Sequence, residues 1–425
     1  MNFLKLVSKY DINQSISHMS LRRVTKNKCA LRSLFWFKES RSNSTTSSTL
    51  NHACWNQAIS RAEQICGYQR SMFQVDGIPS TIDTKDTLTL PTNILKLLSK
   101  LEGSGHPLVR TISDKLIKHT VIQDWELLVF LVSKSFGQSS SIKNSSNVLE
   151  SQRIIAKVAV KMFFQYHLHQ AVVNLQPLNN AGNDLEADNA LVVGNKVAIL
   201  AGDLMLAQAF QNLSDLKNPE IQELIALACR DMTESHFIGR RDEANNPLPL
   251  NPVKKNSTKK DFYSDLAGNP EKEWTLHHTL ATGSLLGKCF QGALILAEHP
   301  KMIQNQGNLL GWHLALAWKA ADDIASILNF TKSEDSKFDL IAAPFLFHLQ
   351  HEPNLYKEIE EGQAIDYVKL HKQVSKGPGL KQTRQLQKKH RLAALAIVAE
   401  LQPSDAREVL QDLVMATQNL SKVSE

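Results

Sequence analysis

The sequence has almost no strand pattern, no long apolar run and no paired cysteines, and each absence narrows the class of protein. Strand-like alternation is confined to Thr87–Leu90, which Pro91 ends, so no sheet is expected to organise the fold. The longest apolar stretch near the middle, Leu127–Val132, is far shorter than the ~20 residues that span a bilayer. We therefore expect a protein that is soluble or at most peripheral to a membrane.

The five cysteines form no C-x-x-C pair and have no histidine at a zinc-site spacing. Their scatter along the chain is typical of free thiols in a reducing compartment. We expect neither a disulfide framework nor a structural metal. The cysteines are Cys29, Cys54, Cys66, Cys229 and Cys289.

Acidic residues are scarce in residues 1–50, which contain nine Lys or Arg but only Asp11 and Glu39 as acids. Subtracting this +7 from the net +6 of the whole chain leaves about −1 for residues 51–425. A nearly neutral body argues against a nucleic-acid-binding surface. A basic, Ser-rich and acid-poor N-terminus is typical of a mitochondrial transit peptide, which we expect at 1–50; a disordered cytosolic tail is the alternative.

From Cys54 onward, apolar residues recur every three or four positions, the spacing of one helix face. This pattern predicts one large all-α domain over 51–425. Two segments interrupt it: 245–270, expected to be a surface loop, and the basic segment 372–390, which Gly377-Pro378-Gly379 interrupts. We expect the basic segment to be a solvated loop, with contact to a diphosphate or an anionic membrane as the alternative. The predicted helices are one from about Cys54, then Ser151–Val173, Val193–Leu213, Pro219–Phe237, Thr275–Glu298, Gln306–Phe330 and a last helix capped by Ser404.

Two strings carry residues of chemical interest. Gly194–Ala209 reads GNKVAILAGDLMLAQA and, on residue types alone, is a core helix whose small residues allow close packing. Asp322 and Asp323, followed by Ser326, lie fifteen residues after the first glycine of Gly307-x-x-x-Gly311. Taken alone, an adjacent pair of aspartates on a helix indicates a solvated face.

Together these strings resemble the trans-prenyl diphosphate synthases. In that family the signature helix reads G-N-K-x-A-x-L-A-G-D, matched here by Gly194, Asn195, Lys196, Gly202 and Asp203. The resemblance implies a single large helical bundle of the isoprenoid synthase type. It also implies two D-D-x-x-D helices, on which carboxylates at i and i+4 share a face and hold Mg²⁺ against an allylic diphosphate.

The chain departs from the family pattern where metal ligands are required. In the segment that resembles the first aspartate-rich motif, Gln170, Ala171 and Asn174 replace the three carboxylates, and in the second motif Ser326 replaces the last. The isopentenyl-diphosphate-binding segment is replaced by Gln123-Asp124-Trp125-Glu126, and the K-T-A lysine by Ala281. Burying a diphosphate without cationic partners is costly. We therefore expect no catalytic residue in this chain and no confident metal site, with Asp322 and Asp323 as weak candidates.

Within the family, the chain resembles the non-catalytic subunits of heteromeric long-chain synthases. The resemblance implies a heterotetramer with a catalytic subunit that carries the Mg²⁺, a mitochondrial matrix location with possible inner-membrane association, and a role in making the ubiquinone side chain from farnesyl and isopentenyl diphosphates. No cofactor is expected in this chain, and no nucleic acid is expected as a partner.

Two alternatives remain open at this point. The chain could be a self-sufficient synthase that uses Asp322 and Asp323 with another anchor, such as His167, His169 or Asp184, although imidazole suits Mg²⁺ poorly. It could instead be a helical scaffold that binds prenyl lipid on a degenerate synthase fold.

Overall fold

The computed structural model divides the chain into two units, Met1–Ser47 and Ser48–Glu425, and the described residues all lie in the second. The described residues are 53–68, 108, 124–138, 148–174, 185–242, 246–252, 266–330, 337–360 and 365–418. The predicted transit peptide at 1–50, the strand candidate Thr87–Leu90 and most of the predicted loop at 245–270 lie outside them.

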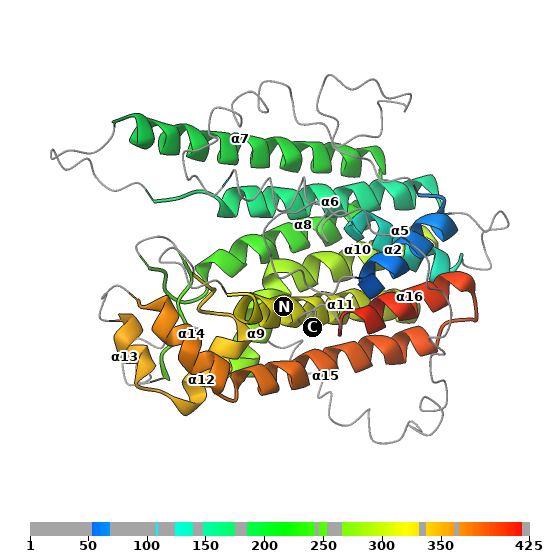
Figure 1. Cartoon of the computed structure of the whole chain (residues 1–425). Helices are drawn as coiled ribbons and strands as arrows, with labels where there is room; N and C mark the ends of the chain where they lie inside the picture. Colours follow the sequence, from blue (N-terminus) through cyan, green and yellow to red (C-terminus); the bar gives the residue numbers. More distant parts are fainter. Residues whose placement is uncertain are drawn as a thin grey trace, which may run out of the picture. The chain divides into compact units, whose positions relative to one another are not determined.

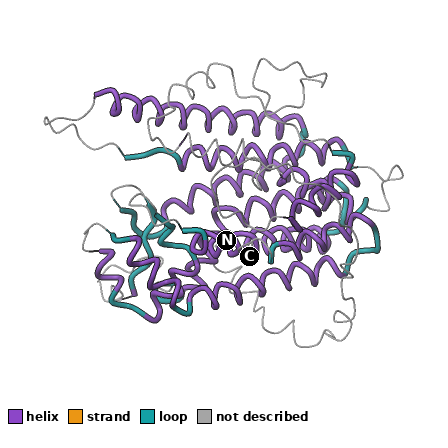
Figure 2. Tube along the Cα trace, viewed as in Figure 1, coloured by secondary structure: helices purple, strands orange, loops and turns teal. Residues whose placement is uncertain are grey.

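The described residues form helices and no strand (Figure 2), which confirms the all-α prediction. The single departure there is an isolated bridge between Arg241 and Pro247. The helices are α2 (Ala53–Cys66), α5 (Asp124–Phe136), α6 (Glu150–Gln170), α7 (Leu185–Asp215), α8 (Pro219–Glu234), η3 (Ser235–Phe237), α9 (Pro270–His278), η5 (Thr279–Gly283), α10 (Ser284–Leu296), α11 (Lys301–Leu328), α12 (Ala343–His351), α13 (Leu355–Glu360), α14 (Tyr367–Lys376), α15 (Gly379–Ala399) and α16 (Asp405–Ala416).

Within this unit the long helices pack in layers (Figure 1). The helices α6 and α7 lie side by side, α10 packs against α6, α8 and α11, and α15 covers the opposite side of α11. The shorter helices α12, α13 and α14 gather near α9 and the start of α15. Two buried clusters result, one that spans α2, α5, α6, α7, α8, α10 and α16, and one around Trp274 and Phe345.

The glycines of the G-x-x-x-G string allow α10 and α11 to pack closely. A Cβ added to Gly311 would lie 2.8 Å from the backbone N and Cα of Gly287, which no side-chain movement could relieve. Gly307 faces Leu294 in the same interface. The string is therefore a helix-packing device in this fold, and it places the C-terminal half of α11 beside α9 and η5.

Helix ends follow the local chemistry predicted from the sequence. Ser404 caps α16 by accepting a hydrogen bond from the backbone N–H of Arg407, as expected, and Asn218 caps α8 in the same way before Pro219. The predicted helix Thr275–Glu298 is interrupted, because Thr279–Gly283 forms a π-helical turn between α9 and α10. Such turns cluster at functional sites.

The prediction that 372–390 is a loop is wrong. The segment belongs to α14 and α15, and only Gly377 and Pro378 separate the two helices. The Gly-Pro-Gly string breaks the helix as expected, but the basic residues around it are helical. They remain solvated because they lie on outward faces, while Val374, Leu386 and other apolar residues of the same helices are buried.

Candidate functional site

The second aspartate-rich motif lies on α11, and its central carboxylate is buried. Asp323 is 1% exposed. Its Oδ2 accepts hydrogen bonds from the indole N–H of Trp274, over 2.7 Å, and from the backbone N–H of Ala343, over 2.9 Å. Its Oδ1 accepts one from the ammonium of Lys319, over 2.5 Å. Asp323 thus connects α9, α11 and the start of α12, and both of its oxygens are occupied by protein donors.

Lys319 supplies the positive charge at this position. Burial alone would lower the pKa of Lys319, but the carboxylates of Asp323, Asp322 and Asp339 outweigh burial and raise it above its usual value. Lys319 therefore stays charged, with Nζ 2.5 Å from Asp323 and 3.3 Å from Asp322. An internal ammonium thus balances the aspartate pair from within the same helix.

The outward face of the motif carries Asp322 and Ser326. Both side chains are exposed and, at i and i+4, lie on one face of α11. The hydroxyl of Ser326 donates to the backbone carbonyl of Asp323, over 2.8 Å. The face therefore presents one carboxylate and one hydroxyl where a metal-binding motif of this spacing has two carboxylates.

The segment that corresponds to the first motif lies at the end of α6. The prediction carried this helix to Val173, but it ends at Gln170, and Ala171 is its buried C-cap. Gln170 and Asn174 are both exposed. Because residues 172–174 are not helical, positions 170 and 174 do not share one helix face in the way that the i, i+4 spacing requires. The carboxylates and the geometry are therefore both missing.

The signature helix α7 holds this segment in place. Asn195 makes a two-way contact with the backbone of Val173, with its Oδ1 accepting and its Nδ2 donating, each over 2.8 Å. The ring of His169 lies directly over Gly202, where a Cβ would come within 2.3 Å of the imidazole. His169 Nε2 is also 3.4 Å from Asp203 Oδ1. The structure thus brings the first-motif segment and the signature residues together; Gly194 is buried and Lys196 is exposed.

The two histidines named as alternative anchors make contacts elsewhere. His169 is engaged with α7 and with Gln165, whose side-chain amide lies 2.8 Å from its Nδ1. The ring of His167 packs on Phe163, with centroids 4.4 Å apart. Asp184 lies outside the described residues.

The segments that should bind diphosphate serve packing instead. Glu126 is buried on α5 and accepts a hydrogen bond from the hydroxyl of Tyr68, over 2.8 Å. Ala281, Thr282 and Gly283 are buried in the π-helical turn, and the hydroxyl of Thr282 donates to the backbone carbonyl of His278. Neither place presents a cation to solvent.

Sequence reasoning missed the groups that bind Asp323. The pairing of Lys319 with Asp323 has a visible signal, since the two are i and i+4 on a helix. Trp274 and Ala343 have none, because they reach Asp323 only through the fold. The sequence also showed no sign of a second buried polar group, between α8 and α10. There Asp231 accepts hydrogen bonds from Ser284, over 2.5 Å, and from Lys288, over 2.6 Å.

A divalent cation does not fit these residues. Mg²⁺ takes oxygen ligands, mainly carboxylates. Asp323 has no free oxygen, and its neighbour Lys319 is positively charged. Within the described part of the chain, no group of three or more His, Cys, Asp or Glu side chains could hold a metal ion.

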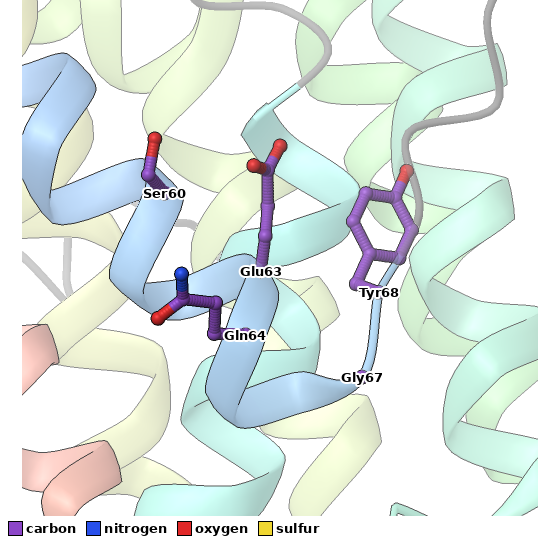
Figure 3. A pocket seen from close by; sticks show the side chains of 5 residues that line it. All are labelled: Ser60, Glu63, Gln64, Gly67 and Tyr68. Carbon is purple, nitrogen blue, oxygen red and sulfur yellow. The ribbon is translucent and has the colours of Figure 1, made fainter.

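A pocket at the end of α2 lies apart from these motifs (Figure 3). It is lined by polar side chains and Gly67, and it contains none of the predicted site residues. Tyr68, at its edge, is the donor to Glu126. The lining residues are Ser60, Glu63, Gln64, Gly67 and Tyr68.

Comparison with known proteins finds the same family that the sequence motifs resemble. Residues 186–363 match the polyprenyl synthetase family. The chain is 30% identical to human all trans-polyprenyl-diphosphate synthase PDSS2, over 88% of this chain and 90% of that protein. It is 28% identical to a probable mitochondrial hexaprenyl pyrophosphate synthase of Yarrowia lipolytica, over 65% of this chain and 59% of that one.

Solved structures support the same fold. A decaprenyl diphosphate synthase from Rhodobacter capsulatus superposes with a TM-score of 0.51 at 16% identity, covering 86% of this chain and 97% of that one. The isoprenoid synthase type of helical bundle is thereby confirmed. The resemblance to subunit 2 of decaprenyl (all-trans-polyprenyl) diphosphate synthase is also confirmed, through the human relative.

Proposed function

The chain belongs to the polyprenyl diphosphate synthase family, and from that premise we propose that it is a non-catalytic subunit of a heteromeric trans-polyprenyl diphosphate synthase. A catalytic partner of the same family would bind Mg²⁺ and elongate farnesyl diphosphate with isopentenyl diphosphate. The product would become the ubiquinone side chain. In this assignment the present chain contributes a contact surface and stability to the complex. None of its groups touches the substrate.

One observation carries the proposal: both oxygens of the buried Asp323 carboxylate already accept hydrogen bonds from the protein, from Trp274, Ala343 and Lys319. A metal cation on Asp323 would lie beside the Lys319 ammonium, which is 2.5 Å from Oδ1, and like-charge repulsion would force that ion pair to open. Breaking a buried ion pair costs about 3–5 kcal/mol. The opposing segment offers Gln170, Ala171 and Asn174, which supply no carboxylate to offset that cost.

The exposed side of α7 supports a protein partner. Its five large exposed apolar side chains lie on a helix whose other side packs on α6. Leu200 is 56% exposed. Large apolar side chains gathered on one exposed side of a helix mark interaction sites. The five are Val192, Val193, Ile199, Leu200 and Phe210.

A protein fits this surface better than lipid. Two helical stretches, Leu191–Asp215 and Pro270–Leu296, have the length and hydropathy of a membrane span, and the second is 67% buried in the core. In the first, Lys196 and Asp203 are exposed near the middle of the helix. Placing such charges at a bilayer centre costs about 2.5–3.5 kcal/mol each. In a protein interface these two charges would instead be met by polar groups of the partner.

A mitochondrial location is part of the proposal. The relative from Yarrowia lipolytica is named as mitochondrial, and residues 1–50 have the composition of a transit peptide. The matrix is the compartment that such a peptide addresses.

A prenyl-transfer assay tests the proposal. The full chain would be expressed alone and together with a paralogue that keeps both D-D-x-x-D motifs, then supplied with farnesyl diphosphate, labelled isopentenyl diphosphate and Mg²⁺. We expect long-chain product only from the co-expressed pair. Turnover by this chain alone, at a rate near that of the pair, would disprove a non-catalytic role.

A substitution on α7 and a matched control on α11 test this surface. Leu200→Glu should weaken co-purification of the paralogue, because it replaces the most exposed large apolar side chain of α7 with a charge. Met302→Glu, which places the same charge at an exposed apolar position on α11, should leave co-purification unchanged. If Leu200→Glu leaves the complex intact, the partner binds elsewhere.

A further inference from the structure

The last third of the chain contains a segment without acids. Residues 367–399 include eight Lys or Arg and no Asp or Glu. These residues form α14 and α15, the orange helices of Figure 1. Residues 151–183 form an acid-free segment of the same length but contain only three Lys or Arg, so the density of positive charge in 367–399 stands out in a region, 51–425, whose total charge is about −1. The proposed function assigns it no role.

Five of its eight cations make neither an ion pair nor a side-chain hydrogen bond within the described part of the chain. Lys369 pairs with Glu358, Lys389 pairs with Glu271, and Arg391 binds Gln418. The other five are exposed and lie on either side of the two-residue break between the helices. We call them the basic junction: Lys372, Lys376, Lys381, Arg384 and Lys388.

The basic junction points away from the motif on α11. Lys381, Arg384 and Lys388 are spaced at i, i+3 and i+7, so they share one face of α15. The opposite face, including Leu386 and His390, is buried and packs on α11. A diphosphate at the family's reaction site would therefore not contact these cations.

We propose that the basic junction binds the surface of an anionic lipid bilayer. Basic residues on the outward face of a helix attract anionic headgroups with about 1 kcal/mol each. α15, with 21 residues, lies along the side of the bundle. At ~1.5 Å per residue it spans ~30 Å, and it would lie parallel to the membrane. Val368, 39% exposed, and Leu392, 47% exposed, add apolar side chains at the two ends of the basic junction.

Other polyanions fit less well. Single-stranded nucleic acid is bound by cations together with aromatic stacking platforms, and residues 368–399 contain no Phe, Trp or Tyr. A protein interface has an apolar centre, whereas here the cations are central and the apolar residues peripheral. The choice of a membrane rests in part on the proposed function, because a long polyprenyl product is insoluble in water and must pass into lipid.

Vesicle sedimentation tests the inference without depending on activity or on a partner. The full chain would be mixed with vesicles of phosphatidylcholine alone and with vesicles containing anionic phosphatidylglycerol. The test variant is K381Q/R384Q/K388Q. The control variant, K217Q/K272Q/K357Q, removes the same charge from exposed lysines elsewhere. All samples keep the basic residues 1–50, so any contribution from that segment is common to them.

We expect binding to anionic vesicles only, weakened by salt, and about 100-fold weaker in the test variant, from three cations at about 1 kcal/mol each. The control variant should bind like the wild type. Equal affinity of test variant and wild type would overturn the inference, as would an equal loss in both variants. Preference for a single-stranded RNA oligonucleotide over anionic vesicles would overturn it in favour of nucleic acid. If the chain does not bind anionic vesicles, the prenyl-transfer result still stands, because that assay contains no membrane.

Discussion

The indole N–H of Trp274 on α9 donates to the carboxylate of Asp323 on α11 over 2.7 Å, and the two side chains are 0% and 1% exposed. A position that corresponds to a metal-ligand motif thus holds an internal hydrogen bond between two helices. The same contact keeps α9 against α11 and removes the carboxylate from solution. The contact gives Asp323 a structural role that does not depend on a metal ion.

Removing the Asp323 charge should destabilise the fold. Asp323→Asn leaves the Lys319 ammonium buried without its strongest partner, and we expect a loss of about 3 kcal/mol in the free energy of unfolding. Asp322→Asn, at an exposed position, should cost less than about 1 kcal/mol. Urea unfolding followed by circular dichroism measures both. Similar losses for the two variants would contradict a structural role for the buried Asp323 carboxylate.

Asp322 should be dispensable for activity of the complex. Because the opposing carboxylates are absent, we expect Asp322→Ala to leave prenyl transfer by the co-expressed pair largely intact. Asp323→Ala is left out of this test, because we expect that change to destabilise the subunit by about 3 kcal/mol and so to alter assembly as well as chemistry. A fall of about tenfold, equal to about 1.4 kcal/mol, in an assembled Asp322→Ala complex would show that this half-site participates.

Restoring the first motif alone should not restore metal binding. The variant Q170D/A171D/N174D supplies carboxylates, but α6 ends at Gln170 and Asp323 stays bound to Lys319. We expect no saturable Mn²⁺ binding by electron paramagnetic resonance, as in the unchanged chain. Stoichiometric Mn²⁺ binding by this variant would mean that the segment can re-form a helix.

Gly311→Ala should test the close packing of α10 on α11. The new methyl group would meet backbone atoms of Gly287 at 2.8 Å, so the helices must separate. Overpacking of this kind costs about 1–3 kcal/mol, and we expect the upper part of that range. Gly292→Ala on α10 is the matched control, since its nearest neighbour would be 3.5 Å away. A melting temperature that falls equally in both variants would argue against the close contact.

The fold should lose stability in mild acid because it buries neutral histidines. Burial, assisted by Arg241, lowers the pKa of His277 to about 4; burial, assisted by Lys389, lowers the pKa of His313 to about 4. His278 and His390 also have lowered pKa values, chiefly through burial. Their unfolded value is about 6.5. The unfolded chain therefore binds more protons below pH ~6.5, and stability falls from there down through pH ~4.

Between pH ~6.5 and ~4, each of these histidines lowers the free energy of unfolding by up to about 1.4 kcal/mol for every unit by which the pH falls. Burial raises the pKa of Glu273 to about 8, and this group acts in the opposite sense, losing stability as pH rises toward 8. The urea midpoint should thus rise slightly from pH 8 to 7 and, because the histidines outnumber Glu273, be clearly lower at pH 5. In H313Q/H390Q, which removes a buried pair whose Nδ1 atoms are 3.0 Å apart, the dependence on pH should be shallower. A midpoint independent of pH between 7 and 5 would show that these groups titrate normally.

The sequence by itself determined the helical class, most helix positions and the family. These depend on short-range patterns: the three- and four-residue spacing of apolar side chains, caps such as Ser404, and the string Gly194–Ala209. It also determined that the first motif lacks carboxylates, because residue identity alone decides that.

Tertiary structure alone decided what the remaining residues do. The sequence shows Asp323 but not Trp274 and Ala343 beside it, since these lie 49 and 20 residues away and meet it only when α9, α11 and α12 pack. The basic segment was predicted as a loop because charge and Gly-Pro-Gly dominate its local pattern. Helices α14 and α15 form there because their buried faces gain packing against α11 and α12, a long-range free energy that no local pattern records.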